Sequence, residues 1–197
     1  MRSSEHWRVF AAIELTPEVR SQLREHIQSL QESVPEAQPS WTRVDNIHIT
    51  LKFFGDVAID RVADIGGAAA RAASNVRGFE IAIEGTGAFP KPKQPKVLWV
   101  GVNDRSGKLA ELQRAFENEC AAEGFPKEER NFRPHLTIAR IRKPTGASEL
   151  GEANQLAGFQ ARSLLVNEIV IFRSQLSSKG SVYTVLTRHK LMVLDKR

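Results

Sequence analysis

The feature that most constrains this sequence is a short pattern that occurs twice. His48-Ile49-Thr50-Leu51 is followed by His135-Leu136-Thr137-Ile138, and the two histidines are 87 positions apart in a chain of 197 residues. Each copy lies in a mostly apolar run, residues 47–54 and 134–141, of the kind that forms a β-strand. A pattern repeated at a little under half the chain length predicts a duplicated lobe, with the two copies facing each other.

The rest of the chain alternates between strand and helix patterns. Thr16 and Pro17 predict a helix start, because threonine caps helix N-termini and proline suits the first helical position. The expected strands are residues 7–14, 47–54, 79–86, 97–102, 134–141, 163–172 and 182–194. Helices are expected after Pro17, over about 60–74 and from Leu109 to near Gly124, and residues 142–158 are interpreted as loop-rich. This order predicts an α+β fold with much antiparallel pairing.

Strand alternation assigns the residues of each motif to two faces. Residues two apart share a face, so His48, Thr50 and Lys52 are expected on one side, opposite an apolar face of Ile47, Ile49, Leu51 and Phe53. The same reasoning places His135 and Thr137 together. Two such strands facing each other would present two imidazoles and two hydroxyls to one cleft.

That constellation suits phosphoester chemistry without a metal. Histidine has an ordinary pKa of about 6.5, so one ring can act as acid and the other as base near neutral pH. Hydroxyl and cationic side chains can bind the phosphate oxygens. The chain has five histidines and no carboxylate near the motifs at ligand spacing, which argues against a zinc site. A single His-x-Thr is more often structural, but two copies on polar faces favour function.

Charge and cysteine content set weaker limits. The net charge of +5 suits an anionic partner, although many soluble proteins are equally basic. The single cysteine, Cys120, allows no internal disulfide and favours a reducing compartment, so we expect a cytoplasmic protein. We expect neither a secretory signal nor a membrane helix, because the apolar runs are far shorter than the ~20 residues such a helix needs.

At the two motifs the chain resembles the 2H phosphoesterase superfamily, and more closely its RNA 2′,3′-cyclic phosphodiesterase (2′-5′ RNA ligase) branch. The resemblance covers nearly the whole chain. It includes Arg8–Ile13, Asn46–Gly55, Phe89-Pro90, Val97–Gly101, Phe132–Arg140, Phe172–Leu176, Gly180 and Tyr183–Leu186. It implies one domain over residues 1–197, built of two intertwined, pseudo-twofold lobes of antiparallel sheet backed by helices, with a central cleft.

The resemblance also implies the reaction and its residues. Water opens an RNA 2′,3′-cyclic phosphate to a 2′-phosphate, with no metal and no cofactor. His48 is then the proton donor and His135 the proton acceptor, while Thr50, Thr137 and Arg140 bind the phosphate. Strict alternation would send Arg140 to the face opposite His135, so a bulge or strand end must redirect it.

Further residues are weaker candidates for RNA contact. Phe10 is expected either in the core or stacked on a base, and Trp41 either in ordinary packing or beside the cleft. Arg133 shares the face of His135 and is a candidate for the RNA backbone, and Lys91, Lys93 and Lys96 lie in a proline-rich loop.

Other functions stay open at this point. They are a noncatalytic RNA-binding module, a sister enzyme acting on another cyclic phosphate, and 2′-5′ ligation by reversal. We expect a monomer whose partner is RNA with a 2′,3′-cyclic phosphate end, for which tRNA halves are one candidate.

Overall fold

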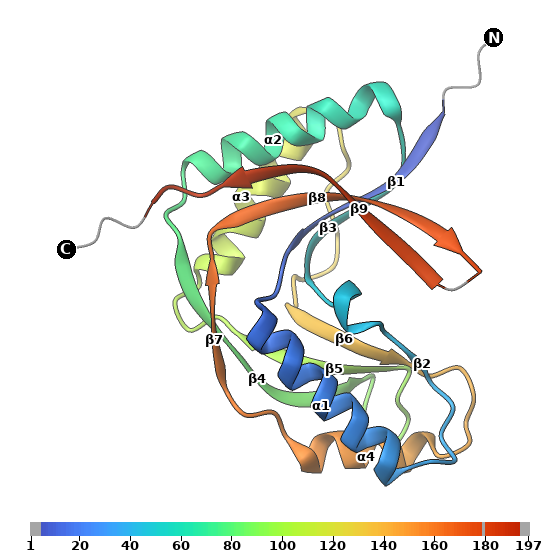
Figure 1. The fold of residues 1–197 in the computed structure, drawn as a ribbon. Helices are drawn as coiled ribbons and strands as arrows, with labels where there is room; N and C mark the ends of the chain where they lie inside the picture. The colour runs from blue at the N-terminus through green and yellow to red at the C-terminus, as the bar shows by residue number, and fades with distance from the viewer. Residues whose placement is uncertain (1–4, 179, 194–197) are drawn as a thin grey trace.

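The computed structural model describes residues 5–178 and 180–193, which form two antiparallel sheets and four α-helices (Figure 1). The first sheet has the strand order β3-β1-β8-β9 and the second β2-β6-β5-β4-β7. The strands are β1 (His6–Ile13), β2 (Ser40–Trp41), β3 (Ile49–Ala58), β4 (Phe79–Phe89), β5 (Val97–Asn103), β6 (His135–Arg140), β7 (Arg162–Val166), β8 (Glu168–Ser177) and β9 (Gly180–Lys190). The helices are α1 (Pro17–Ser33), α2 (Val62–Ser74), α3 (Lys108–Ala122) and α4 (Ala147–Ala157), with short 3₁₀ turns at Val44–Asn46 and Ile59–Arg61. The α+β prediction is confirmed.

The chain contains two runs with the same order of elements. Strand, helix, motif strand and helix occur first as β1, α1, β3 and α2, and again as β5, α3, β6 and α4. The pairing within the two runs is equivalent residue by residue. Ala12 pairs with Thr50 in the first run, and Trp99 pairs with Thr137 in the second, so both members of the pair shift by 87 positions.

The helices are exchanged between the two runs. Helix α3 follows β5 of the second sheet but packs against α2 and approaches β3 of the first sheet. Helix α1 follows β1 of the first sheet but packs beside α4, which contacts β4 of the second sheet (Figure 1). Each sheet is therefore covered by one helix from each run.

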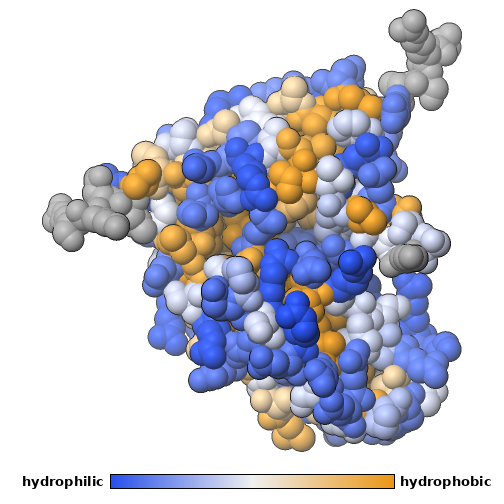
Figure 2. Space-filling view, in the orientation of Figure 1, coloured by the Kyte–Doolittle hydropathy of each residue, from blue (hydrophilic) through white to orange (hydrophobic). Residues whose placement is uncertain are grey.

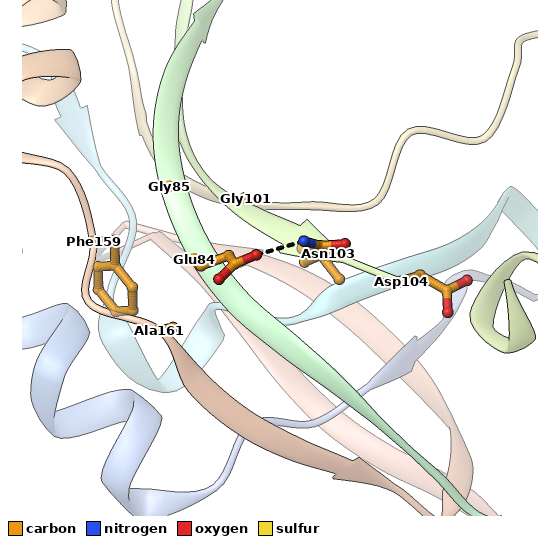
Figure 3. Close-up of a pocket in the computed structure, with 8 residues that line it drawn as sticks. Glu84, Gly85, Gly101, Asn103, Asp104, Phe159 and Ala161 are labelled. Carbon is orange, nitrogen blue, oxygen red and sulfur yellow. Dashed lines mark hydrogen bonds between the residues drawn. The ribbon is translucent and has the colours of Figure 1, made fainter. Parts of the chain in front are cut away.

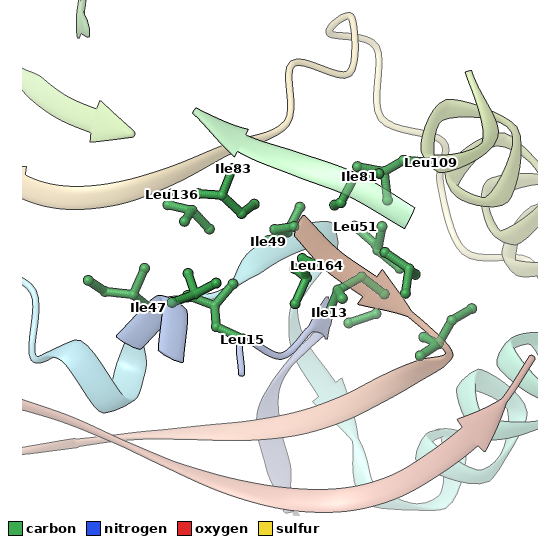
Figure 4. Packing of buried hydrophobic residues seen from close by; sticks show 14 of the residues in the cluster. Ile13, Leu15, Ile47, Ile49, Leu51, Ile81, Ile83, Leu109, Leu136 and Leu164 are labelled. Carbon is green, nitrogen blue, oxygen red and sulfur yellow. The ribbon is translucent and has the colours of Figure 1, made fainter. Parts of the chain in front are cut away.

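One apolar cluster connects both sheets. Figure 4 shows Ile13 and Ile49 from the first sheet packed near Ile83, Leu136 and Leu164 from the second. These side chains are at most 2% exposed. At its start, α1 is fixed by Thr16, whose hydroxyl accepts a hydrogen bond from the Val19 amide, as the sequence predicts.

The region predicted to be loop-rich contains a helix, α4, so that prediction is wrong there. The buried face of α4 consists of Leu150, Gly151 and Asn154, which gives almost no apolar periodicity to detect. Gly151 lies so close to the loop between β4 and β5 that a Cβ would come within 2.1 Å of the Pro92 carbonyl oxygen. The buried Asn154 amide donates to the Gly87 carbonyl and accepts a hydrogen bond from His26 of α1.

The predicted strand over residues 163–172 is in fact two strands in different sheets. β7 ends at Val166 and pairs with β4, whereas β8 begins at Glu168 and pairs with β1. Asn167 separates them, and its carbonyl accepts a hydrogen bond from the Leu191 amide. The strand predicted for 182–194 is observed as Gly180–Lys190, and residue 194 lies outside the described residues.

Candidate active site

The two motif histidines are held in the same way. Nδ1 of His48 lies 2.8 Å from the Asn46 carbonyl oxygen, and Nδ1 of His135 lies 2.7 Å from the Arg133 carbonyl oxygen. Because a carbonyl only accepts, Nδ1 carries the hydrogen in both rings. Among the described residues, neither Nε2 has a hydrogen-bond partner. Each Nε2 is therefore available to a substrate, as an acceptor in the neutral ring and as a donor in the charged ring.

A β-bulge follows each motif threonine. In the first sheet Thr50 pairs with Ala12 and Lys52 with Ala11, which leaves Leu51 as the extra residue. In the second sheet Ile138 is the extra residue, between Thr137 and Ala139. Ile138 and Ala139 are both buried and Arg140 is exposed, so the bulge turns Arg140 toward the face of Thr137, as expected from the sequence.

The bulge at Leu51 makes the predicted placement of two residues in β3 wrong. Lys52 was expected beside His48 and Thr50, but it is buried, and its ammonium donates to Glu117 at 2.7 Å and to the Pro126 carbonyl at 2.8 Å. Phe53 was expected in the core, but 62% of it is exposed. The extra residue at Leu51 reverses the alternation, so Lys52 faces α3 and Phe53 faces the side of His48.

Aromatic rings surround His48. Phe10 stacks on the imidazole at a centroid distance of 4.7 Å, and Tyr183 meets it edge-on at 5.6 Å. Phe10 is only 2% exposed and also stacks on Phe172, so its ring packs against His48 and is not free to stack on a base. Of the two alternatives expected for Phe10, core packing is therefore the one observed, and base stacking is not. Burial lowers the pKa of His48 to about 4, so the free protein holds this ring neutral at pH 7.

The surroundings of His135 are different. Phe89 meets His135 edge-on at 5.2 Å and itself contacts Trp99, which pairs with Thr137. Arg133 supplies the carbonyl that orients His135, and its side chain is exposed. Trp41 lies in the two-residue β2, pairs with Ala139 of β6 and packs against the core.

Sequence reasoning missed two residues beside the histidines. The Asn46 side chain donates to the Ser181 carbonyl at 2.8 Å and so ties the β8–β9 hairpin to the segment before His48. Tyr183 of that hairpin covers part of the ring. Asn46 could have been found from the repeat, because it precedes His48 by two positions as Arg133 precedes His135.

The two motif strands approach each other, with Cα atoms of β3 and β6 within 8 Å. They come from different sheets, so the approach joins the two runs of the repeat. On the face shown in Figure 2, hydrophilic side chains gather across the middle of the molecule, between the parts built on the two sheets. Strand β3, which directly follows His48, and strand β6, which begins at His135, therefore lie close together.

Comparisons of this sequence with known proteins identify its family. Residues 17–177 match the 2′-5′ RNA ligase superfamily, which is most of the chain. A protein of Methanothermobacter thermautotrophicus named RNA 2′,3′-cyclic phosphodiesterase is 33% identical over 90% of this chain and 95% of its own length. This chain belongs to that phosphodiesterase family. A relative from Thermotoga maritima with the same name is 31% identical over 91% of this chain and 92% of its own.

Solved structures show that the family fold is shared. A crystal structure from Thermus thermophilus has a TM-score of 0.74 and 25% identity, covering 93% of this chain and 97% of that one. Escherichia coli LigT in its apo form has a TM-score of 0.72 and 25% identity, covering 95% and 99%. The two-sheet arrangement is therefore the family's, and this chain is an enzyme of the phosphodiesterase class.

One pocket of this phosphodiesterase lies beside β4 and β5. The pocket in Figure 3 is lined by Glu84, Asn103, Asp104 and Phe159 and contains neither motif histidine. Its Glu84 carboxylate accepts a hydrogen bond from Asn103 and lies 3.7 Å from Arg105. Among residues 5–178 and 180–193, no group of three His, Cys, Asp or Glu side chains is placed to hold a metal ion. No described helix is both long and apolar enough to cross a membrane.

Proposed function

We propose that this enzyme hydrolyses the 2′,3′-cyclic phosphate at an RNA 3′ end and leaves a 2′-phosphate. The observation that carries the proposal is the pair of histidines at equivalent positions of the repeat, at the starts of two strands that approach each other. Each has Nδ1 bonded to a carbonyl, and neither Nε2 has a hydrogen-bond partner among the described residues. The curated relatives named RNA 2′,3′-cyclic phosphodiesterase support the substrate class.

The proton transfers follow from two imidazoles on opposite sides of the phosphorus. Nε2 of neutral His135 takes a proton from water as the water oxygen bonds to phosphorus. Nε2–H of charged His48 gives its proton to the ribose 3′ oxygen as the P–O3′ bond breaks. After the step His135 carries a proton and His48 is neutral. Exchange of protons with solvent then restores the starting charges of both rings.

The remaining candidates bind the phosphate. Thr50 and Thr137 each follow their histidine by two positions, and their hydroxyls donate to the nonbridging oxygens. Arg140, turned by the bulge at Ile138, adds a charge-assisted hydrogen bond. A relative, Escherichia coli LigT, has been crystallised with phosphate, which supports an anion site in this fold.

The low pKa of His48 requires a source for its proton. Burial favours the neutral ring in the free protein. The cyclic phosphate carries one negative charge, and that charge beside Nε2 stabilises the imidazolium. In this proposal His48 therefore takes up its proton as substrate binds. Both histidines come from one chain, so the site needs no second copy, and a monomer suffices.

Product analysis tests the function. A short RNA ending in a 2′,3′-cyclic phosphate is incubated with the enzyme, and the products are assigned by phosphorus NMR and terminal mapping. A 2′-phosphate is expected. A predominant 3′-phosphate would reverse the roles of the histidines relative to the two ribose oxygens, and no hydrolysis would refute the function. A tRNA half with the same terminus tests whether a longer RNA is a better substrate.

A further inference from the structure

Two segments of the chain account for its whole excess of positive charge. Residues 85–103 and 131–148 contain seven of the 28 Lys and Arg residues and none of the 23 Asp and Glu residues. The rest of the chain has slightly more acidic than basic residues, so the net charge of +5 arises from these two segments. A basic excess confined to part of a protein indicates a surface for an anionic partner more specifically than net charge does.

The fold brings these two segments together at the end of β6. Val97, the first residue of β5, pairs with Arg140, the last residue of β6. Past the ends of both strands, the Ile141 amide donates to the Lys96 carbonyl at 2.9 Å. The loop from β4 to β5 and the loop from β6 to α4 therefore lie side by side. Together with the end of β6 they carry six exposed cations, here called the basic surface: Lys91, Lys93, Lys96, Arg140, Arg142 and Lys143.

The cations of the basic surface have no carboxylate partners in the part of the chain that the structure describes. By contrast, Arg71 and Arg188 each form ion pairs with two carboxylates. Lys143 donates to the neutral side chain of Gln38 at 3.0 Å. Like charges gathered without counter-charges repel one another, and a bound anion relieves that repulsion.

The loop between β4 and β5 has a set conformation. The Lys96 amide donates to the Phe89 carbonyl at 2.7 Å, which closes the loop at its base. Pro95 is buried, and Gly151 of α4 lies against this loop so closely that no Cβ fits between them. The lysines therefore extend from a backbone that is already ordered, which reduces the entropy cost of binding one ligand with several of them.

A row of cations suits a polyanion better than a single phosphate. In the proposed function Arg140 binds the cyclic phosphate, and it is also a member of the basic surface. The basic surface thus begins at the candidate active site and continues onto two loops beyond it. An RNA chain carries one negative charge per nucleotide, and Lys and Arg bind backbone phosphates without reading the bases.

We propose that the basic surface binds the backbone phosphates on the 5′ side of the cyclic phosphate, so that the preferred substrate is an RNA chain and not a short nucleotide with the same terminus. This inference rests on the proposed function. The terminal phosphate contacts Arg140, and the preceding nucleotides pass over the lysines of the β4–β5 loop and over Arg142. Because these contacts are with phosphates, the preference depends on RNA length and on salt concentration but not on base sequence.

The test compares two substrates of different length. A dinucleotide and an RNA of about 12 nucleotides are used, both ending in a 2′,3′-cyclic phosphate. The ratio of their kcat/KM values, longer over shorter, measures what the preceding backbone contributes. The triple variant Lys91→Ala/Lys93→Ala/Arg142→Ala keeps Arg140 and should lower this ratio about tenfold at low salt, mainly through KM of the longer RNA.

A matched control removes the same charge from another part of the surface. The triple variant Arg105→Ala/Lys108→Ala/Arg114→Ala replaces three exposed cations on α3 and just before it. It should leave both the ratio and the activity unchanged. An unchanged ratio in the variant of the basic surface, or an equal fall in this control, would overturn the proposal, because the effect would then be absent or would reflect net charge alone.

Binding gives a second readout that needs no turnover. An RNA of the same length with a 3′-hydroxyl end is labelled at its 5′ end, and its affinity is measured by fluorescence anisotropy at several salt concentrations. Each phosphate contact with a single strand contributes about 0.7 to the slope of log K against log salt, so the slope should decrease by about 2 when three contacts are lost. An unchanged slope would overturn the proposal. Failure of the wild-type enzyme to hydrolyse either substrate would instead refute the proposed function, and the anisotropy measurement would still decide the role of the basic surface.

Discussion

Lys52 and Glu117 form a buried ion pair, 2.7 Å long, between β3 of the first repeat and α3 of the second. Lys52 is 5% exposed and Glu117 is 8% exposed. The pair joins the strand that carries one motif to the helix exchanged from the other half of the chain. Lys52 directly follows the β-bulge at Leu51, so the ion pair helps to hold the backbone in its bulged conformation.

Breaking this pair on one side should destabilise the fold. Lys52→Met leaves the Glu117 carboxylate buried without its cation, and such changes cost about 3–5 kcal/mol. Glu117→Leu should be similar, and the double variant should lose less than the sum of the two, because neither buried charge then remains. Urea unfolding gives these values. Lys108→Met, which removes an exposed lysine at the start of α3, is the control. Additive losses would show that the two residues do not act as a pair.

Removing either motif histidine should remove most activity without unfolding the protein. Loss of a positioned acid or base typically costs about 10²- to 10⁴-fold in rate. The double variant His48→Ala/His135→Ala should be little worse than either single variant, since the two act as a unit. Steady-state kinetics measure this, with the exposed His6→Ala as the control. A single variant that keeps more than about a tenth of the wild-type rate would rule out the acid–base pair.

The lowered pKa of His48 should be visible as stability that depends on pH. The unfolded chain protonates this histidine near pH 6.5, but the folded protein does so only near pH 4. Between these values the unfolded state binds more protons, so the free energy of unfolding falls as pH drops from 6.5 toward 4 and is fully present above 6.5. Urea unfolding across this range should show a weaker slope in His48→Gln. Since burial also lowers the pKa values of His26 and His189, a smaller slope remains in that variant.

Inorganic phosphate should raise the pKa of His48. Histidine NMR titrations, with His48→Gln to assign the resonance, should give a pKa near 4 in the free protein and a higher value with phosphate. An anion beside Nε2 favours the charged ring. No shift on adding phosphate would contradict the proposal that substrate binding protonates His48.

Activity should survive chelation of divalent metals. The two imidazoles transfer the protons, and Arg140 and the two threonines bind the developing charge, so the proposed steps use no metal ion. Hydrolysis of the cyclic phosphate is measured before and after exhaustive EDTA treatment. Loss of activity, restored by a divalent cation, would require a metal-dependent mechanism.

Much of the fold follows from patterns that depend on neighbouring residues. Helix α1 has its cap, its proline and a stripe of buried residues three or four apart, so Thr16 and Pro17 mark its start correctly. Helix α4 has no such stripe, because Gly151 and Asn154 bury it through close approach and hydrogen bonds. The break at Asn167 depends on pairing with strands more than 80 residues away, which no local pattern records.

The residues of the site likewise divide into those that local sequence patterns predict and those that they do not. The repeated motif locates both histidines and the bulge that Arg140 requires. It does not locate the matching bulge at Leu51, because apolar residues at Leu51 and Phe53 fit ordinary alternation. Ordinary alternation therefore places Lys52 and Phe53 on the wrong faces of the strand. The two copies of the motif share the bulge, because Leu51 corresponds to Ile138 in the repeat. A bulge required by Arg140 in the second copy therefore also predicts one in the first.

The exchanged helices have a consequence for the separability of the two halves. Cutting the chain between the repeats would leave each sheet covered by a helix from the other fragment, as α3 covers β3 and α1 packs with α4. Neither fragment could bury its apolar face by itself, and two fragments would have to associate to do so. A half-length chain with this repeat would thus be stable only as a domain-swapped pair, and the present chain has the architecture of such a pair joined into one polypeptide.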